Sequence, residues 1–392
     1  VSERGAAVHR RAKHGDEITV LVTQMCVLVH ILATATVIDV AIIGGGPCGL
    51  ATALALSKAT CLHNAKVAVY ETDSFAPKGA SIQISKAGWS AITAVDREAA
   101  SRIRATGSPV TRVSFRSLDG KSLTPKPLTL LVLLVSLAFR MLRLFGVRRG
   151  ITRTHTWHDV RSTLAERLRE RWGADVIQSG RTLTAVDAQS ADAVELRFSG
   201  REEETVTARV VLACDGTRSA VRRLLPGEPG DDLLVNEERS VWRGIAPAFS
   251  TRGEATFYKD GAGRSGLVFP AGVGQGSSWS LIAPAAEGRA ADPDEARRRM
   301  EAALPHGIQL DATLRKAIDG SPTVLEHKLV VRDFDNHPWT CSVPRVAYLG
   351  DAAHPLRPTG EGTALAFEDA LTVGMLAAQA DSLDAFCVPA TL

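Results

Sequence analysis

The feature that most constrains the fold is a glycine-rich turn between an apolar strand and an apolar helix. Residues 37–43 (VIDVAII) are rich in β-branched side chains, which predicts a buried parallel strand. This strand leads directly into GGGPCG at 44–49, and residues 50–59 (LATALALSKA) favour a helix. A G-x-G-x-x-G turn in this strand–turn–helix context is typical of a dinucleotide-binding βαβ unit.

Each glycine of the turn has a physical reason to be there. Gly44 permits the tight turn, Gly46 lets a pyrophosphate approach the backbone, and Gly49 allows close helix–strand packing. A second strand is predicted at 66–70 (KVAVY), and Glu71 at its end is placed to accept hydrogen bonds from a ribose. The alternative, a glycine-rich turn without a ligand, does not explain the position of Glu71.

A second turn follows a strand predicted at 210–213. Asp215 and Gly216 come directly after this strand, and Ser219 can cap the helix that follows. An aspartate at a strand end with a flexible glycine beside it can line a cofactor crevice. Taken alone, an Asp-Gly pair is more often an ordinary turn.

A third turn, LGDAAHPLRPTGEG at 349–362, follows a strand predicted at 345–349 and precedes a helix predicted at 364–380. Asp351 is expected at a C-terminal strand end, where α/β sheets bind ligands and where its carboxylate can accept hydrogen bonds from a polyol. His354 has two interpretations, direct chemistry and a structural hydrogen bond, and the second is more common for a loop histidine.

Composition gives no sign of a nucleic-acid-binding protein or a metal site. The 392 residues include 46 basic and 43 acidic side chains, so no concentrated basic charge favours nucleic acid. The six cysteines form no CxxC pair and have no histidine at a metal-ligand spacing. We therefore expect neither a metal site nor a disulfide framework, and a reducing intracellular compartment.

Two apolar segments leave open an organellar or membrane-associated location. Residues 18–38 follow a basic stretch and contain Ala33-Thr34-Ala35, which resembles the cleavage site of a targeting peptide. Residues 128–144 are interrupted by Arg140 and are too short for a membrane span, so a buried helix or an interfacial anchor is expected. Membrane association through 18–38 or 128–144 is one alternative, and a buried segment is the other.

Together the three turns resemble the motifs of the class A flavoprotein monooxygenases, the aromatic hydroxylases related to zeaxanthin epoxidase. That family carries an N-terminal GxGxxG, a central DG motif and a late GD motif. The corresponding stretches here are GGGPCG at 44–49, ACDGTRSAVR at 213–222 and GDAAHPLRP at 350–358. The resemblance implies an α/β fold, with a Rossmann-like FAD-binding domain of the glutathione-reductase type and an inserted antiparallel-sheet substrate domain.

The resemblance also implies how the chain is divided into domains. Residues 1–36 are expected to be an N-terminal extension. The expected FAD-binding domain comprises 37–75, 150–232 and 340–392, and the expected substrate-domain segments are 76–149 and 233–339.

By the same resemblance, the residues of the three turns contact FAD. The expected contacts are Gly44, Gly46 and Gly49 with the pyrophosphate, Glu71 with the adenosine ribose, Asp215 and Gly216 with FAD and the passage of NAD(P)H, Asp351 with the ribityl chain, and Pro358, Gly360 and Gly362 with the isoalloxazine ring. The family also places a flavin-contacting arginine where Trp157 stands here, and Arg153 and Arg161 are the alternative sources of that charge.

The implied reaction is a monooxygenation with FAD as the cofactor and NADH or NADPH as the co-substrate. NAD(P)H would reduce the flavin, O2 would add to form a flavin hydroperoxide, and its distal oxygen would hydroxylate or epoxidise a small aromatic or lipophilic organic substrate. A lipid or isoprenoid reductase and a non-catalytic flavoprotein are the alternatives. The sequence assigns no catalytic base and leaves the substrate, the choice of nicotinamide cofactor and the oligomeric state open.

Overall fold

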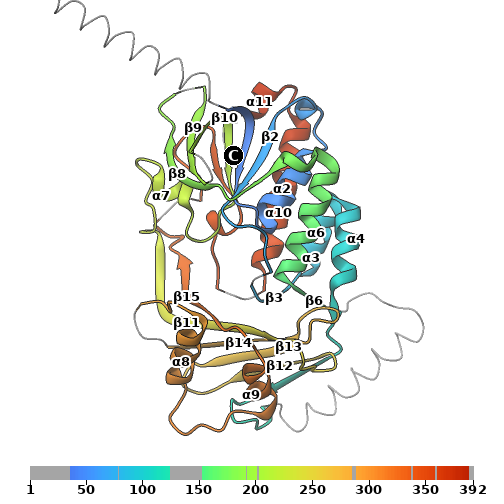
Figure 1. Cartoon of the computed structure of the whole chain (residues 1–392), viewed down its shortest axis with the longest axis vertical. Helices are drawn as coiled ribbons and strands as arrows, with labels where there is room; N and C mark the ends of the chain where they lie inside the picture. The colour runs from blue at the N-terminus through green and yellow to red at the C-terminus, as the bar shows by residue number, and fades with distance from the viewer. Residues whose placement is uncertain are drawn as a thin grey trace, which may run out of the picture.

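The computed structural model describes residues 36–387 except 78, 124–151, 191, 201–202, 285–287, 337–338 and 358–359. The described residues form two large sheets, one above the other in Figure 1, with a small sheet between them. Nearly all of the apolar segment 18–38 and the whole of 128–144 lie outside the described residues, so both predictions for them stay predictions. No helix in the described ranges is long and apolar enough to cross a bilayer.

The upper sheet is built on the predicted βαβ unit. Its strands are β1 (Thr36–Ile43), β2 (Val67–Glu71), β7 (Ile177–Ser179), β8 (Thr182–Asp187), β9 (Val194–Ser199), β10 (Glu204–Ala213) and β16 (Val346–Tyr348). Their order is β7-β2-β1-β10-β9-β8, and β16 also pairs with β10. The pairs β1–β2, β1–β10 and β10–β16 are parallel, so these four strands end at the same edge.

The register places those four strand ends in one row. Ile43 at the end of β1 lies opposite Tyr70 of β2 on one side and Ala213 of β10 on the other. Ala213 in turn lies opposite Tyr348, the last residue of β16. The chain segments that follow the four strands therefore leave the sheet side by side, and these segments contain the three turns predicted to bind a cofactor.

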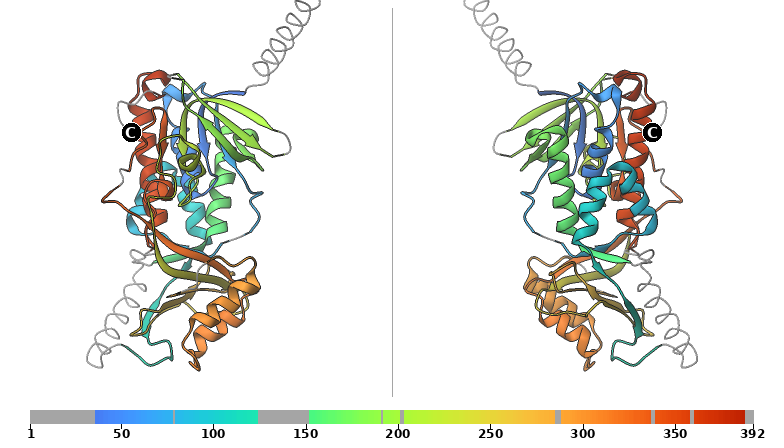
Figure 2. Two further views of the ribbon diagram at one scale, coloured as in Figure 1. Left: turned by 90° about the vertical axis from the view of Figure 1, so that its left-hand side faces the viewer. Right: turned by 90° about the vertical axis from the view of Figure 1, so that its right-hand side faces the viewer.

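Helices cover one face of this sheet, as Figure 2 shows from both sides. The longer helices are α2 (Pro47–Leu56), α3 (Lys86–Val95), α4 (Arg97–Thr106), α6 (Trp157–Trp172) and α10 (Gly362–Gln379). The short ones are η1 (Thr60–Leu62), η2 (Ala174–Val176), η3 (Gly350–Ala352) and α11 (Leu383–Cys387). Helix α7 (Ala220–Leu224) packs through Val221 in a separate core on the opposite face. One continuous apolar core joins the longer helices to β1 and β10, with Leu50, Leu164 and Phe367 fully buried in it.

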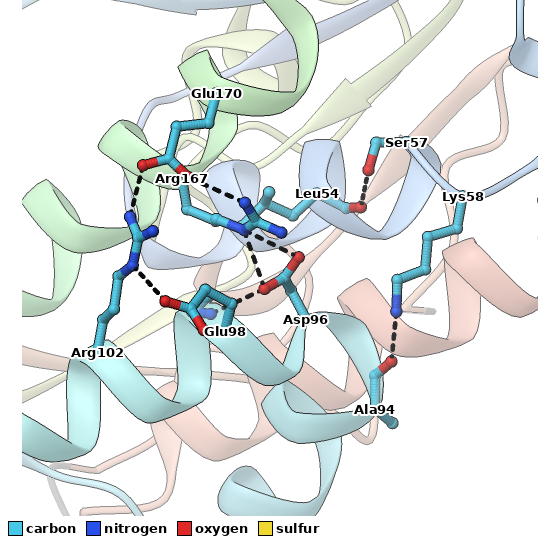
Figure 3. Close-up of polar contacts among 10 residues, drawn as sticks. Leu54, Ser57, Lys58, Ala94, Asp96, Glu98, Arg102, Arg167 and Glu170 are labelled. Atoms are coloured by element: carbon cyan, nitrogen blue, oxygen red, sulfur yellow. Dashed lines mark hydrogen bonds and ion pairs between the residues drawn. The ribbon is translucent and has the colours of Figure 1, made fainter.

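Polar contacts fix α4 against α6 at the outer side of this core (Figure 3). Asp96 caps α4 by accepting a hydrogen bond from the Ala99 N–H at 2.8 Å, and Arg167 of α6 donates to both of its carboxylate oxygens at 3.2 Å. Nearby, Arg102 of α4 bridges Glu98 and Glu170. Burial raises the pKa of the Asp96 carboxyl, but the Ala99 N–H and Arg167 outweigh it and the net shift is downward.

The lower sheet in Figure 1 is largely antiparallel. Its strands are β5 (Arg112–Arg116), β11 (Leu234–Ala246), β12 (Glu254–Lys259), β13 (Ser265–Pro270), β14 (Ser277–Pro284) and β15 (Leu325–Arg332), in the order β15-β11-β14-β13-β12-β5. Helices α8 (Pro293–Ala303) and α9 (Ala312–Asp319) cover its outer face. The small sheet comprises β3 (Ser81–Gln83), β6 (Arg153–Thr156) and β4 (Ser108–Pro109).

The two faces of the lower sheet differ in chemistry. Trp242, Trp279 and Tyr258 point toward α8 and α9 and belong to a separate apolar core. Because side chains alternate along a strand, Arg243 and Ser280 point to the opposite face. Next to Ser280 on that face, the Ser278 hydroxyl accepts a hydrogen bond from the Ser81 N–H of β3 at 3.4 Å, so this face is turned toward the upper part of the molecule.

The α/β fold predicted from the sequence is confirmed, with small differences at the ends of elements. The predicted helix at 50–59 begins earlier, at Pro47, because proline suits the first helical turn. The predicted helix at 364–380 begins at Gly362. The predicted strand at 345–349 is shorter, since Arg345 has a φ of 67° that does not fit a strand.

The packing of helices α3 and α4 bears on the expected division into domains. Helices α3 and α4 belong to 76–149, which the sequence assigned to the substrate domain, yet Ile92, Val95 and Ile103 are buried in the core of the upper sheet. A Cβ added to Gly88 of α3 would lie 2.8 Å from the Cα of Ala364 in α10. We therefore propose that α3 and α4 belong with the upper sheet, and the full division into domains stays a prediction.

Candidate functional site

The glycine turn after β1 has the geometry of a cradle for a phosphate group. Gly44 has a φ of 104°, and a Cβ there would lie 2.5 Å from the Cys214 carbonyl oxygen. A Cβ on Gly49 would lie 2.0 Å from the Gly44 carbonyl oxygen, so glycine is required for the helix to pack on the turn. A Cβ on Gly46 would meet no atom within 4 Å, which leaves the backbone at the start of α2 accessible to a ligand.

The N-terminus of α2 adds partial positive charge to this cradle. Gly46 is the N-cap residue, and no side chain caps the helix. The first N–H groups of an α-helix lack partners within the helix, so they can donate to a phosphate.

Glu71 lies beside the cradle, as predicted from its position after β2. Its Oε2 accepts a hydrogen bond from the Gly45 N–H at 2.8 Å, and its Oε1 accepts one from the Asp73 N–H at 3.0 Å. The guanidinium of Arg161, a residue of α6, is 2.9 Å from the same Oε2. The carboxylate is therefore fixed at the edge of the glycine turn.

The turn after β10 brings a second carboxylate to the same edge. Cys214 donates its N–H to the Ile43 carbonyl at 2.7 Å, which keeps this turn against the end of β1. Asp215 Oδ2 accepts from the Val221 N–H at 3.0 Å, whereas its buried Oδ1 has no hydrogen-bond partner among the described residues. Burial raises the pKa of the Asp215 carboxyl. Gly216 has a φ of 84° and open space on its Cβ side.

The turn after β16 brings Asp351 to the other end of the row. Gly350 has a φ of 59°, and a Cβ there would lie 2.9 Å from Cys48 Sγ in α2. The Asp351 side chain keeps solvent-exposed surface, yet the surrounding protein raises its pKa, while the charges of His354 and Arg243 act in the opposite direction. The Asp351 carboxylate is therefore accessible to a ligand at the end of β16.

The start of α10 lies next to Asp351. A Cβ on Gly362 would be 3.5 Å from Asp351 Oδ1, and a Cβ on Gly360, with a φ of 94°, would meet nothing within 4 Å. Glu361 is the N-cap residue and provides no side-chain cap, so the helix N–H groups remain available. Pro358, the other residue predicted at this place, lies outside the described residues.

His354 has a structural hydrogen bond. Its Nε2 is 2.8 Å from Asp369 Oδ2, and the same carboxylate oxygen accepts a hydrogen bond from the Gly350 N–H at 2.6 Å. Burial lowers the pKa of His354, but the hydrogen bond and charge of Asp369 outweigh it, so the net shift is upward. This pair fixes the turn that carries Asp351, which favours the structural interpretation of His354.

Three buried arginines support these turns, and sequence reasoning did not assign them this role. Arg161 donates from Nε to the Gly45 carbonyl at 2.7 Å. Arg222 donates to the carbonyls of Thr217, Gly230 and Ala352 at 2.6–2.8 Å, and so joins the second and third turns. Arg332 of β15 donates to the Ala353 carbonyl at 2.6 Å. The sequence does contain one indication of this role, an arginine at an otherwise apolar position. Arg161, for example, lies on the same helix face as Leu164 and Leu168.

Of the two alternative arginines near Trp157, only one reaches the cradle. Arg161 lies under the glycine turn, whereas Arg153 donates to the Gly107 carbonyl at 2.7 Å in the small sheet.

Arg243 links the lower sheet to these turns through its charge. It is half-buried, and its guanidinium makes no hydrogen bond or ion pair with another described residue. Burial lowers its pKa, and the nearby Asp351 charge opposes that shift. On the same sheet face, desolvation by the surrounding protein and the charge of Arg243 lower the pKa of His327 to about 4, although its side chain keeps solvent-exposed surface, so this imidazole is neutral at pH 7. The described residues contain no cluster of side chains suited to a metal ion.

Residues 152–380 match the family described as FAD binding domain. The chain is 28% identical over 348 residues to FAD-dependent monooxygenase orf3 of Aspergillus niger, a match that covers 85% of this chain and 74% of that protein. It is 30% identical over 211 residues to dual trans-enoyl reductase/FAD-dependent monooxygenase tazHJ of Aspergillus terreus, and that match covers 50% of this chain and 29% of the relative. The chain thus spans less than a third of the second protein.

Solved structures share the fold. HpxO of Klebsiella pneumoniae complexed with FAD and uric acid aligns with a TM-score of 0.63 and 22% identity, covering 89% of this chain and 82% of that chain. At this level of identity the likeness shows a common fold.

Proposed function

The chain belongs to the FAD-binding domain family of FAD-dependent monooxygenases, and we propose that it uses NADH or NADPH and O2 to hydroxylate or epoxidise a small aromatic or lipophilic molecule. The observation that carries this proposal is the row of four strand ends with the three turns beyond it. Three strand spacings separate β2 from β16, about 14 Å, which suits an extended dinucleotide better than a compact ligand.

In this proposal the two halves of FAD lie at opposite ends of the row. Glu71 binds the adenosine ribose, the N–H groups near Gly46 bind the pyrophosphate, and Asp351 binds the ribityl chain. The unpaired Oδ1 of Asp215 supports a ligand here, because a buried carboxylate oxygen without a donor is costly and a ligand hydroxyl would satisfy it. Bound FAD supplies the redox chemistry with NAD(P)H and O2, and the protein supplies its orientation.

The inner face of the lower sheet is the proposed wall of the substrate pocket. Ile245, Leu267 and Ile282 are half-buried on this face, on three neighbouring strands. Half-buried aliphatic side chains suit an aromatic ring or a lipophilic chain, and they help to exclude water from the reacting atoms. The charged side chain of Arg243 lies on the same face, with His327 beside it.

We further propose that the substrate carries an acidic oxygen, such as a phenol or enol. Arg243 is a half-buried cation with no partner among the described residues, and pairing with an anionic oxygen would compensate its desolvation. Because His327 is neutral at pH 7, it can exchange a hydrogen bond with the same group without adding charge.

The reaction is tested by oxygen uptake and product analysis. Purified protein should show a flavin spectrum and should oxidise NAD(P)H faster when a suitable phenol or isoprenoid is added, with one atom of ¹⁸O2 appearing in the product. Saturation of a double bond without oxygen incorporation would instead identify a reductase. Bound flavin that NAD(P)H does not reduce would identify a non-catalytic flavoprotein.

The acidic oxygen is tested by comparing each phenol with its methyl ether. We expect the phenol to stimulate turnover more strongly than the ether in the wild-type chain, and Arg243→Gln to abolish this difference while flavin content stays unchanged. Equal stimulation by phenol and ether in the wild-type chain would contradict the role of Arg243.

A further inference from the structure

We propose that Arg161 makes the site selective for FAD over the shorter flavin FMN, by fixing Glu71 in the position from which its carboxylate binds the adenosine ribose. Arg161 would act through Glu71, as a positioning residue, and would not itself touch the ribose. This inference rests on the proposed placement of the adenosine half at Glu71. FMN lacks the adenosine, so it should not depend on either residue.

The contacts of Arg161 join the two chain segments that form this end of the site. Its Nε donates to the Gly45 carbonyl at 2.7 Å, and its Nη1 donates to Asp73 Oδ1 at 2.8 Å. Its Nη2 is 2.9 Å from Glu71 Oε2. One planar guanidinium therefore holds the glycine turn after β1 and the acidic turn after β2 in a fixed relation.

Aromatic rings hold the guanidinium in place. Its central carbon lies 3.7 Å from the centre of the Phe75 ring and 5.0 Å from that of Trp157. The Arg161 side chain is 1% exposed, and cation–π contacts are strongest when the cation is desolvated. Phe75 has a φ of 63°, an unfavourable conformation for this residue type, so the surrounding contacts must hold the loop in this shape.

The helix face explains how Arg161 reaches the turn. Arg161, Leu164, Ala165 and Leu168 recur at helical spacing on the buried face of α6, so Arg161 replaces an apolar side chain at the end of this stripe. Trp157 occupies the preceding turn of the same face. The family places its flavin-contacting arginine where Trp157 stands here. In this chain the arginine that reaches the glycine turn is Arg161, one helical turn later.

Counting the bonds on Glu71 shows what remains for a ligand. An ionised carboxylate offers about four acceptor positions. The Gly45 and Asp73 N–H groups use two of them, and the Arg161 guanidinium faces Oε2 as an ion-pair partner at 2.9 Å. About two positions are left, which suits the hydroxyls of a ribose. Without these partners the side chain would be free to rotate away.

Electrostatics gives Arg161 a second effect on the same ligand. Burial lowers the pKa of Arg161, and the charge of Glu71 opposes that shift, so the guanidinium is held charged by its acidic partners. Loss of this cation would leave Glu71 and Asp73 uncompensated at the end of the cradle where a pyrophosphate is expected. Like charges in a partly buried site repel strongly. The loss should therefore weaken binding of the adenosine-side phosphate of FAD, which FMN lacks, as well as the ribose contact.

The test measures dissociation constants for FAD and FMN on the full-length chain freed of flavin, by quenching of flavin fluorescence. The variants are Arg161→Gln, Arg161→Lys and Glu71→Gln. The matched control is Arg102→Gln, because Arg102 also bridges two carboxylates, Glu98 and Glu170, but on the exposed outer side of α4. Because both ligands are measured on the same protein, a variant that folds poorly would lose FMN and FAD alike.

We expect Arg161→Gln to raise the FAD dissociation constant about 30-fold or more, as for other truncated buried charge pairs, with the FMN constant changed less than about threefold. Arg161→Lys should restore part of the FAD affinity, because it keeps the charge but not the three-way fork. Glu71→Gln should likewise affect FAD and spare FMN, and Arg102→Gln should change neither.

Two outcomes would overturn the inference and are distinguishable. If Glu71→Gln weakens FAD selectively but Arg161→Gln lowers FAD and FMN affinity in the same ratio, Arg161 is a folding residue and only its proposed role is wrong. If Glu71→Gln leaves the FAD-to-FMN ratio unchanged, the adenosine half lies elsewhere, and the proposed placement of the cofactor is wrong as well.

Discussion

Substitution of alanine at two glycines of the same turn should separate cofactor binding from folding. A Cβ at Gly46 would meet no protein atom within 4 Å, and Gly46 has a φ of −77°, which alanine adopts readily. A Cβ at Gly49 would lie 2.0 Å from the Gly44 carbonyl oxygen. The first methyl group projects into the proposed ligand space, and the second projects into the protein.

The structure gives the size of each effect. Ordinary C···O contacts are about 3.3 Å or longer, so α2 must shift by about 1.3 Å to accept Gly49→Ala. Overpacking of this kind costs about 3 kcal/mol or more in free energy of unfolding. In Gly46→Ala, alanine is a poorer N-cap than glycine, which lowers the free energy of unfolding. Alanine also reduces the conformational entropy of the unfolded chain, which raises it, and the two effects offset each other to within about 1 kcal/mol.

The assay combines urea unfolding of the flavin-free chain with titration of FAD. We expect Gly46→Ala to unfold at nearly the wild-type urea concentration but to bind FAD at least about tenfold more weakly, since displacing a phosphate from its N–H donors loses charge-assisted hydrogen bonds. We expect Gly49→Ala to unfold at a clearly lower concentration. The reasoning is wrong if Gly46→Ala binds FAD as tightly as the wild-type chain, or if the two variants lose equal stability.

Three further predictions concern the third turn and the lower sheet. Asp351→Ala should weaken FAD binding by about 10- to 100-fold, the value of one charge-assisted hydrogen bond, and full flavin occupancy in this variant would contradict the assignment of the loop. Asp369 raises the pKa of His354, so this pair should stabilise the fold fully below about pH 6.5 and lose its contribution as pH rises through the raised pKa. In the variant Asp369→Asn, the urea concentration at the midpoint of unfolding should depend less on pH over this range. His327, with a pKa of about 4, should show no imidazole titration between pH 5.5 and 8 by NMR, and its contribution to stability should decline as pH falls from about 6.5 toward 4.

The cofactor-facing turns could be predicted from the sequence because their chemistry is local. A β-branched strand, glycines at fixed spacing and an acid at the next strand end each report on neighbouring residues in the chain. The predictions for Gly44, Gly46 and Gly49 required only the backbone conformation and the approach of α2. The structure brings Glu71, Asp215 and Asp351 to the same sheet edge, as their positions after strands suggested.

The supporting arginines could not be predicted in the same way, because their partners are distant in the chain. Arg161 reaches Gly45, and Arg222 reaches Ala352, across more than a hundred residues in each case. A basic residue on an apolar helix face indicates that it has buried acceptors but does not identify them. For the same reason, the sequence could not predict that helices α3 and α4 pack into the core of the upper sheet: amphipathic sequence specifies a buried face but not which sheet covers it.

Strand β15 ends in a double attachment to the turn that carries Asp351. The backbone N–H of Arg332 donates to the Pro355 carbonyl at 3.2 Å, and its side chain holds the carbonyl of Ala353. This corner of the lower sheet is therefore stiff relative to the cofactor edge. When a bulky substrate binds between the two sheets, the lower sheet should rotate about β15. Its largest movement is expected at the opposite edge, where the exposed rings of Phe115 and Phe257 stack.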